Sequence, residues 1–321
     1  MASTSSAEAP PSAVRRHGEP WALGFVLGYA SANMFDGLAM LNADTDPRIG
    51  PVLRGLPSLL LGIVLVWKYG TLKQLRPTSP EFIGVRAIWA FVAAGVISTV
   101  GLFFYYYAIR FGGVTITVPA QETYVLWGTL IAWLFLGERT RAYALAGVGL
   151  TFVGLVVLSL GKSIGQAMLP HWYWAIPLGL LTGLTYGVSG VLWRDGQLRG
   201  AHQSTAIFLQ FSTSTLVGLI GASFAVRNGA LHAIVWNSLG ALVASGVLSG
   251  VVAIYCMFTA LRLLAVARVY AFSSLTPLVA TLFAYFALRE YLNLVMVLGI
   301  LLVGAGVVLT QIFRPRDERQ A

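Results

Sequence analysis

Three ionisable side chains lie inside long apolar runs of the sequence, where charges are rare. They are Asp36, Arg54 and Glu122. A charged group inside a bilayer costs roughly 2.5–3.5 kcal/mol on insertion scales, so such groups usually pair with one another or handle protons, ions or substrates. We therefore expect these three residues to mark the functional part of the molecule.

Glu122 is the deepest of the three. A helix predicted over 114–136 places it about 12 Å from the helix start, at about 1.5 Å per residue, close to the middle of a hydrocarbon layer about 30 Å thick. Low dielectric favours the neutral form of a carboxyl group, so Glu122 can exchange a proton or bind a substrate amine. The alternative is a buried glutamate hydrogen-bonded across a helix interface.

Asp36 and Arg54 lie at similar depth on two helices predicted over 21–41 and 50–68. Asp36 is about 8 Å and Arg54 roughly 6 Å from the outer ends of these helices. A short loop joins the two helices, which favours a structural or gating ion pair. The alternative is that Arg54 pairs with a substrate carboxylate, and the sequence does not decide between the two.

Polar and aromatic residues at helical spacing accompany these charges. Together they predict a cavity for a mid-sized, partly apolar solute, although any single aromatic residue could belong to the interfacial belt or to core packing. Pro277 is expected to loosen the ninth helix and free carbonyl groups toward the cavity, with a plain kink as the alternative. The remaining candidate site residues are Tyr29, Asn33, Tyr124, Trp127, Tyr186, Ser189, Tyr270 and Ser274.

The composition indicates that these helices are surrounded mostly by lipid. Of the 321 residues, 57% are hydrophobic and 10% are charged, against about 25% charged in average soluble domains; the mean hydropathy is +0.77. A soluble enzyme, a disordered regulator and a disulfide scaffold are excluded, the last because Cys256 is the single cysteine. The net charge of +9 is typical of basic residues flanking membrane spans, and we expect no nucleic-acid partner.

The apolar runs predict an all-α polytopic membrane protein with ten transmembrane helices. Residues 1–20 form a disordered cytoplasmic tail, 21–161 and 173–312 two five-helix repeats, and 313–321 a second cytoplasmic tail. With both termini inside, 15 of the 21 Lys and Arg residues fall on the cytoplasmic side, as the positive-inside rule requires. The predicted helices cover 21–41, 50–68, 84–109, 114–136, 142–161, 173–193, 203–225, 238–262, 267–287 and 292–312.

The two halves repeat with a shift of 152 positions and no gap across three helices. Arg110 then falls on Arg262, and Glu138 on Glu290. Because each half has five helices, an odd number, the second half must enter the membrane upside down. Inverted repeats place a substrate site near the midplane between the halves and favour alternating access. Duplication in a purely structural protein is the alternative.

Two sets of motifs resemble a known family. The first half has Tyr-Ala-Ile-Arg over 107–110 and Leu-Phe-Leu-Gly-Glu-Arg over 134–139. The second half has Thr-Ala-Leu-Arg over 259–262, Ser-Ser-Leu-Thr-Pro over 273–277 and Leu-Arg-Glu over 288–290. With the ten-span pattern, they resemble EamA-type members of the drug/metabolite transporter superfamily, which implies export or exchange of small metabolites, including amino acids.

The first half departs from this family pattern in its fourth helix. Val125 stands where the second half has Pro277, and Pro119 lies six residues earlier. Glu122 stands where the second half has Ser274. The usual shape of the fourth helix is therefore not carried over to this chain.

The sequence does not indicate an enzyme. Residues 187–190 match the short Gly-x-Ser-Gly string of intramembrane serine proteases, but such a protease needs a histidine at membrane depth. The four histidines fall in tails, loops or helix ends, and no Walker A, HExxH or GxGxxG motif is present, so neither cofactor nor metal is expected. No ring of charges or repeated filter loop indicates an ion channel.

We therefore predict a secondary transporter in a bacterial inner membrane, surrounded by lipid and carrying a small organic metabolite, with an amino acid as first candidate. The resemblance favours export, and protons are the candidate coupling ion. Two alternatives stay open: an uncoupled facilitator of metabolite diffusion, and a non-transporting membrane scaffold or sensor.

Overall fold

In the part of the chain that the structure describes, helices are joined by short turns and loops, and no strand is present. The computed structural model describes residues 18–42, 44–124, 126–128, 130–131, 142–164, 171–227, 236–263, 272–273 and 275–312. The first half contains α2 (Glu19–Leu41), η1 (Pro47–Ile49), α3 (Gly50–Tyr69), η2 (Thr71–Leu75), α4 (Val85–Gly112), α5 (Val114–Gln121) and α7 (Ala142–Ser163). The second half contains η3 (Trp172–Trp174), α8 (Ala175–Leu198), α9 (Gln203–Arg227), α10 (Trp236–Val247), η5 (Leu248–Ala253), α11 (Ile254–Leu263), α13 (Thr276–Leu288) and α14 (Leu294–Ile312).

Each of the ten predicted helix ranges contains a helix within the described residues. Five helical segments there are long and apolar enough to cross a membrane by themselves, which makes this a multi-pass membrane protein; the count of ten spans stays a prediction. These five segments are Pro47–Tyr69, Val85–Gly112, Trp172–Leu198, Gln203–Arg227 and Ser238–Met257.

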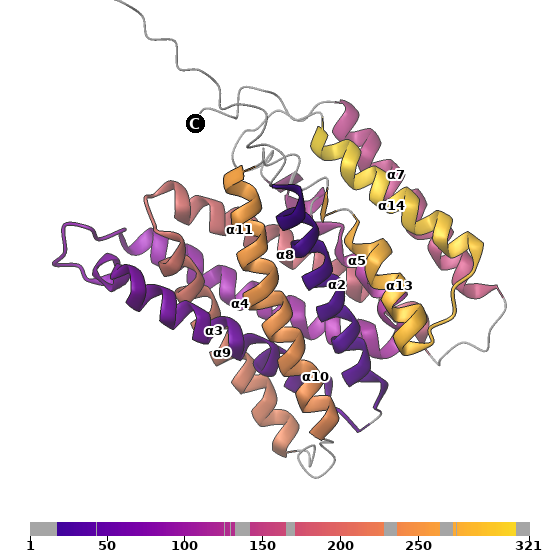
Figure 1. The fold of residues 1–321 in the computed structure, drawn as a ribbon, viewed down its shortest axis with the longest axis horizontal. Coiled ribbons are helices and arrows are strands. Elements are labelled where there is room, and N and C mark those ends of the chain that lie inside the picture. The colour runs from indigo at the N-terminus through magenta and orange to yellow at the C-terminus, as the bar shows by residue number, and fades with distance from the viewer. Residues whose placement is uncertain are drawn as a thin grey trace, which may run out of the picture.

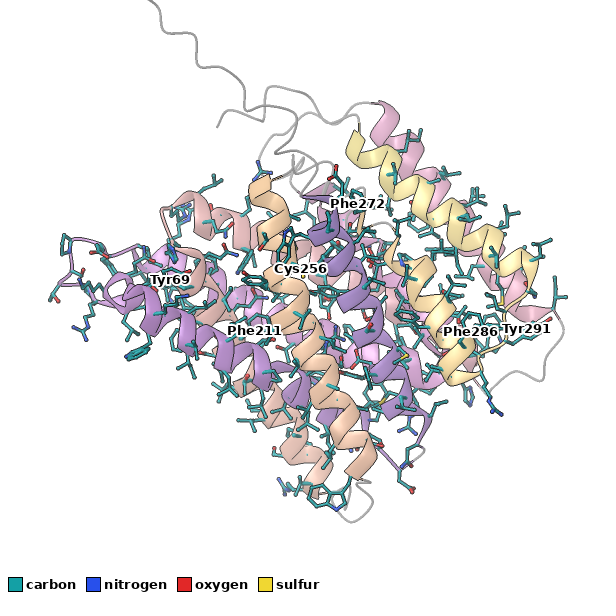
Figure 2. All side chains as sticks on the ribbon, viewed as in Figure 1. Tyr69, Phe211, Cys256, Phe272, Phe286 and Tyr291 are labelled. Atoms are coloured by element: carbon teal, nitrogen blue, oxygen red, sulfur yellow. The ribbon has the colours of Figure 1, made fainter. Side chains whose placement is uncertain are left out.

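Large apolar side chains cover the outside of the helices (Figure 2). Trp67 is 82%, Leu294 85% and Phe286 74% exposed. Burying a side chain of this size is normally worth about 1.5–3 kcal/mol, so a surface of this kind fits contact with hydrocarbon rather than with water.

The helix contacts are reciprocal between the two halves. α4 packs against α8, and in return the rod α10–η5–α11 packs against α2; α5 contacts α8 as α13 contacts α2. α3 packs against α9, and α7 against α14, which run side by side along one flank in Figure 1. Exchanging the halves therefore maps these contacts onto one another, as a pseudo-two-fold relation between repeats requires.

The fourth predicted helix is not continuous, which corrects the expectation of one helix over 114–136. α5 ends at Gln121, and Glu122 and Thr123 form a turn before helix resumes at Tyr124. Pro119 has no N–H to donate to the preceding turn. The amide of Thr123 bonds the carbonyl oxygen of Ala120 at 3.3 Å, and its hydroxyl bonds the same oxygen at 2.7 Å, so the α-helical ladder stops here.

Pro277 occupies the first turn of α13 rather than the middle of a long helix. A proline is well tolerated there, because the N–H it lacks would have no partner inside the helix. Pro277 is buried and does not line the cavity described below. Within the described residues it starts a helix, so the alternative of a plain kink inside a continuous ninth helix does not hold there.

Candidate functional site

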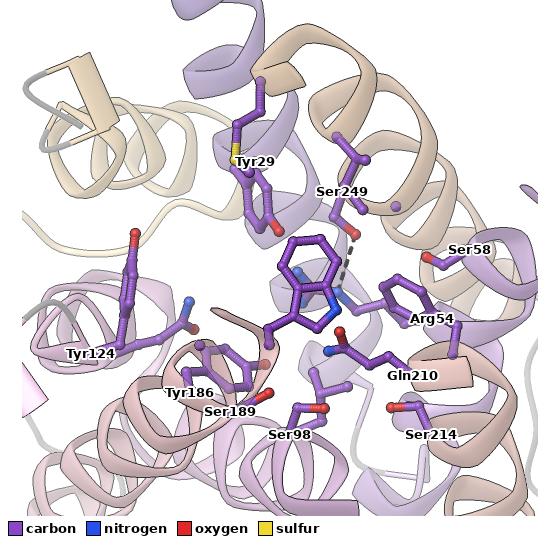
Figure 3. A pocket seen from close by; sticks show the side chains of 18 of the residues that line it. Tyr29, Arg54, Ser58, Ser98, Tyr124, Tyr186, Ser189, Gln210, Ser214 and Ser249 are labelled. Atoms are coloured by element: carbon purple, nitrogen blue, oxygen red, sulfur yellow. Dashed lines mark hydrogen bonds between the residues drawn. The ribbon is translucent and has the colours of Figure 1, made fainter. Parts of the chain in front are cut away.

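A cavity of about 300 Å³ lies between the two repeats (Figure 3). Its wall combines the N-terminal halves of α2 and α3, the middle of α4 and α9, and the C-terminal part of α8. The turn after α5, the η5–α11 rod and the start of α13 complete it. Six predicted site residues line it: Tyr29, Arg54, Glu122, Tyr124, Tyr186 and Ser189.

Two glycines of α8 allow the turn at Glu122 to lie close against that helix. A Cβ atom on Gly183 would lie 3.0 Å from the carbonyl oxygen of Gln121, and one on Gly187 would lie 2.7 Å from the amide nitrogen of Gly128. Small residues allow such close helix approach in membranes. The glycines of α8 thus set how far Glu122 projects into the cavity.

Glu122 lacks the partners that a buried carboxyl group normally has. Its residue surface is 5% exposed, and its Oε2 atom has no hydrogen-bond partner among the described residues. A buried, unpartnered polar atom costs about 1–3 kcal/mol, so proteins keep one mainly where a ligand or proton is to meet it. Glu122 is also the one acidic residue in the cavity wall within the described part of the chain.

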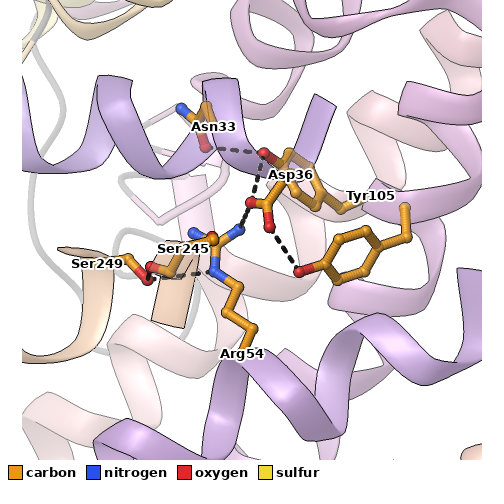
Figure 4. Close-up of polar contacts among 7 residues, drawn as sticks. Asn33, Asp36, Arg54, Tyr105, Ser245 and Ser249 are labelled. Atoms are coloured by element: carbon orange, nitrogen blue, oxygen red, sulfur yellow. Dashed lines mark hydrogen bonds and ion pairs between the residues drawn. The ribbon is translucent and has the colours of Figure 1, made fainter. Parts of the chain in front are cut away.

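Asp36 and Arg54 form an ion pair at the edge of the same cavity (Figure 4). Asp36 is fully buried and does not line the cavity, whereas Arg54 lines it and is 8% exposed. Nη1 of Arg54 bonds Oδ2 of Asp36, and Nε of Arg54 donates to Ser249 Oγ at 3.3 Å. The arginine thus joins the two repeats, since Ser249 belongs to the second.

Two adjacent tyrosines complete this cluster. The hydroxyl of Tyr106 donates to Oδ1 of Asp36 at 2.8 Å. The hydroxyl of Tyr105 lies 3.2 Å from Oδ2 of Asp36 and 2.8 Å from Oδ1 of Asn33, and the Tyr105 ring lies 5.4 Å from the guanidinium carbon of Arg54. Both tyrosines are fully buried. Protein donors therefore surround Asp36, whose side chain is fully buried.

The start of α5 is fixed by a residue from the other repeat. Glu290 accepts hydrogen bonds from the amides of Val114 at 2.8 Å and Thr115 at 3.0 Å, and from the Thr115 hydroxyl at 2.6 Å. A carboxylate at a helix N-terminus satisfies free amides and complements the helix dipole. Gly113 permits this approach, because its φ is +77° and a Cβ there would lie 2.6 Å from Glu290 Oε1.

Of the other predicted site residues, the structure places Asn33 and Trp127 outside the cavity wall. Asn33 belongs to the Asp36 cluster rather than to the cavity wall. Trp127 is not part of the wall either; it packs beside Gly187, and its Nε1 has no partner among the described residues. Tyr270 and Ser274 lie outside the described residues, as does Glu138, the repeat counterpart of Glu290.

Most polar residues of the wall escaped sequence analysis. Gln210 and Ser98 are polar residues in the middle of apolar spans, and that signal could have found them. The other serines and the aromatic residues carried no distinguishing pattern. The unpredicted wall residues include Phe25, Ser58, Ser98, Gln121, Trp193, Gln210, Phe211, Ser214, Ser249, Met257 and Thr276.

The described residues contain no group of three or more His, Cys, Asp or Glu side chains that could hold a metal ion. What the wall offers instead is one acidic group, one paired arginine, hydroxyls, amides and aromatic rings. Such a wall can bind and release a small organic solute through hydrogen bonds, apolar contacts and a single charge.

Two repeats of helices around an internal cavity form an architecture found in small-molecule transporters. The profile of the EamA-like transporter family matches residues 18–160 and 173–312. This chain therefore belongs to the EamA-like transporter family, which confirms the resemblance seen in its motifs. The family makes it a membrane transporter of small molecules.

Comparison with solved structures agrees on the fold. One of them, titled only "Crystal structure of protein", superposes with a TM-score of 0.58 at 18% sequence identity, covering 92% of this chain and 98% of the other. A likeness at this identity speaks for the fold alone. No curated protein matches the chain.

Proposed function

We propose that the protein is a secondary transporter that exports a small organic metabolite, an amino acid or a close relative of one, from the bacterial cytoplasm by alternating access. Its ten helices form two inverted repeats with both termini inside. The cavity between the repeats supports this proposal. Its volume of about 300 Å³ is at the small end of the range typical of ligand pockets, roughly 300–1,000 Å³.

The observation that carries the proposal is the Oε2 atom of Glu122, which has no hydrogen-bond partner among the described residues and belongs to a carboxyl group in the cavity wall. A carboxyl group in this position can hold a proton when the cavity is empty and an ammonium group when it is loaded. One group that binds either a proton or cargo couples the two movements, and a proton gradient can then drive export.

The Asp36–Arg54 cluster is the proposed gate on the outer side. Asp36 lies in the C-terminal half of α2, whereas the cavity reaches Phe25 in its N-terminal half. With the N-terminus inside, the cluster lies toward the outer face and the cavity toward the cytoplasm. This is the arrangement in which an exporter takes up its cargo.

Counterflow in proteoliposomes tests the function. Vesicles loaded with an unlabelled amino acid, nucleoside or amine are diluted into labelled solute at two pH values, and uptake is followed over time. We expect saturable exchange of one solute class, faster where Glu122 can cycle its proton. Flux that is indifferent to pH would identify an uncoupled facilitator, and absence of flux from folded protein across the panel would favour a scaffold or sensor.

A further inference from the structure

Few charged side chains line the described part of the cavity wall. Within the described residues, Arg54 and Glu122 are the two members of the wall that are charged at neutral pH in water. Arg54 is paired with Asp36 directly behind it, so this pair contributes no net charge. The charge of the empty site is therefore set by Glu122 alone.

A site enclosed in hydrocarbon is stable only near electrical neutrality, because uncompensated charge loses its hydration. The empty cavity is neutral when Glu122 carries a proton. With Glu122 ionised, the loaded cavity is neutral when the cargo brings one positive charge. A cargo without net charge allows two loaded states. If Glu122 is ionised, the site has a net negative charge. If Glu122 keeps its proton, no carboxylate is present to pair with an ammonium group.

We propose that the cargo carries a net charge of +1 and exchanges for one proton on Glu122. This inference rests on the proposed function and narrows its substrate class. On binding, the O–H bond of the Glu122 carboxyl group breaks, its proton leaves to the water on the open side, and the carboxylate pairs with the cargo ammonium. No covalent bond forms between cargo and protein, and the proton returns when the cargo leaves on the other side.

The remaining groups that face Glu122 do not compete for this proton. The other titratable residues of the wall are Tyr29 from α2, Arg54 from α3, Tyr124 directly after the turn and Tyr186 from α8. The wall segments of α4, α9, η5–α11 and α13 add no histidine, lysine or acidic residue among the described positions. Tyrosine and arginine keep their protons in the neutral range, which leaves Glu122 as the exchanging group.

The wall also selects the shape of such a cation. The rings of Tyr29 and Tyr186 can face an ammonium group and attract it through their π-electrons. Phe25, Phe211 and Met257 offer apolar surface to a carbon chain. Organic ammonium ions without a carboxylate and amino acids with a basic side chain share the required net charge of +1, and the second kind can also place its carboxylate beside Arg54.

A matched pair of solutes tests the charge requirement. Lysine and norleucine have carbon chains of the same length, but lysine has net charge +1 and norleucine is neutral overall; benzyltrimethylammonium serves as a fixed cation without a carboxylate. In proteoliposome counterflow we expect saturable exchange of lysine or benzyltrimethylammonium, at least tenfold faster than that of norleucine. Norleucine exchange as fast as either cation, or exchange of none of the three, overturns the inference.

Membrane potential gives a second and independent test. Exchange of one monovalent cation for one proton moves no net charge, so potassium–valinomycin clamps should leave cargo accumulation unchanged while a pH gradient drives it. If one net charge moved per cycle, a clamp of about 100 mV would change accumulation roughly 50-fold, and the inference would be wrong. Saturable, potential-driven transport of norleucine would refute the charge rule and leave the carrier function standing.

Two variants assign the effect to residues. The control variant W127F changes a residue outside the cavity wall, so it should keep the preference for lysine over norleucine, whereas E122Q should lose it; a preference that E122Q retains would overturn the inference. Proton release provides a readout independent of transport. Benzyltrimethylammonium binding in weakly buffered detergent should release about one proton from the unmodified protein and none from E122Q; no release from the unmodified protein would equally overturn it.

Discussion

Two buried carboxyl groups lie within reach of the same cavity, and their surroundings are opposite. Asp36 is met by the guanidinium of Arg54 and by the hydroxyls of Tyr105 and Tyr106. Glu122 has an Oε2 atom that no described residue meets. A carboxylate with three donors is stabilised as an anion and holds the fold together, whereas one without donors is left for a proton or a ligand. From this contrast we propose a structural role for Asp36 and a role in transport for Glu122.

The largest effect is expected from breaking the Asp36 cluster. Asp36→Ala removes the acceptor of Arg54 Nη1 and of the Tyr106 hydroxyl, while the Tyr105 hydroxyl keeps Oδ1 of Asn33. Arg54→Ala leaves a buried anion. Removal of one partner of a buried ion pair costs about 3–5 kcal/mol. We expect either change to lower the free energy of unfolding by this amount in detergent micelles, measured by titration with a denaturing detergent.

The double variant D36N/R54Q provides the control for this prediction. It removes both charges while keeping polar groups of similar size, so it should cost clearly less than the two single variants added together. If the single alanine variants cost under about 1 kcal/mol, as surface pairs do, then the cluster does not stabilise the fold.

The opposite result is expected at Glu122. Glu122→Gln keeps the shape of the side chain and breaks no hydrogen bond of Oε2 within the described structure, so the unfolding free energy should change by less than about 1 kcal/mol. Accumulation driven by a pH gradient should be lost, because the amide cannot take up and release the coupling proton.

Trp127→Phe is the matched control for Glu122→Gln. Trp127 lies just beyond the same turn, but it is not part of the cavity wall. This variant should retain accumulation driven by pH. If Glu122→Gln accumulates cargo along a pH gradient as well as the unmodified protein does, Glu122 has no role in proton coupling. The proposed difference in role between Glu122 and Asp36 would then be wrong.

The main features of the fold could be predicted from local sequence. Apolar runs such as 50–68 and 203–225 are long enough to require membrane helices, and the matching helices α3 and α9 extend only slightly further. The depths of Asp36 and Arg54 followed from helix rise, which is why their proximity could be foreseen. Both arguments use only the distance along one helix.

What escaped prediction depends on contacts between distant segments. The end of α5 at Gln121 depends on the hydroxyl of Thr123 and on the approach of Gly183 from α8. Gln210 reaches the cavity only because α9 packs against α3 and α4. A pattern within one span cannot give the rotation of that span relative to others, so these residues looked like ordinary interior positions.

A smaller effect is expected where the second repeat fixes α5. Glu290→Gln keeps one acceptor but loses the charge that serves two amides and a hydroxyl, and Gly113→Ala puts a Cβ at 2.6 Å from Glu290 Oε1 on a backbone with φ +77°. Each change should lower the free energy of unfolding by about 1–2 kcal/mol. Transport should also slow, because α5 carries the Glu122 turn.

Gly149→Ala is the control for Gly113→Ala. Gly149 lies within α7, and a Cβ there meets nothing within 4 Å. The substitution should leave stability unchanged or raise it by up to about 1 kcal/mol, as alanine does in a helix. Equal losses from both glycine variants would mean that the approach of Glu290 contributes nothing specific.

The smallest effect is expected at a third carboxyl group, Asp46, in the loop between α2 and η1. Burial raises the pKa of Asp46, but hydrogen bonds from the side chain and backbone of Arg48 outweigh it, so the pKa lies below its ordinary value of 3.8. A lowered pKa in the folded state gives stability that is present above pH 3.8 and is lost as the pH falls through the folded value. The pair is partly exposed, so this contribution should stay below about 1 kcal/mol.

The test compares the free energy of unfolding of Asp46→Asn with that of the unmodified protein between about pH 3 and pH 6. The variant should lose only the part of the stability that depends on the ionisation of Asp46. If Asp46→Asn loses as much stability as Asp36→Ala, then the contribution of a carboxylate to the free energy of unfolding depends on the number of its donors rather than on its burial in the membrane.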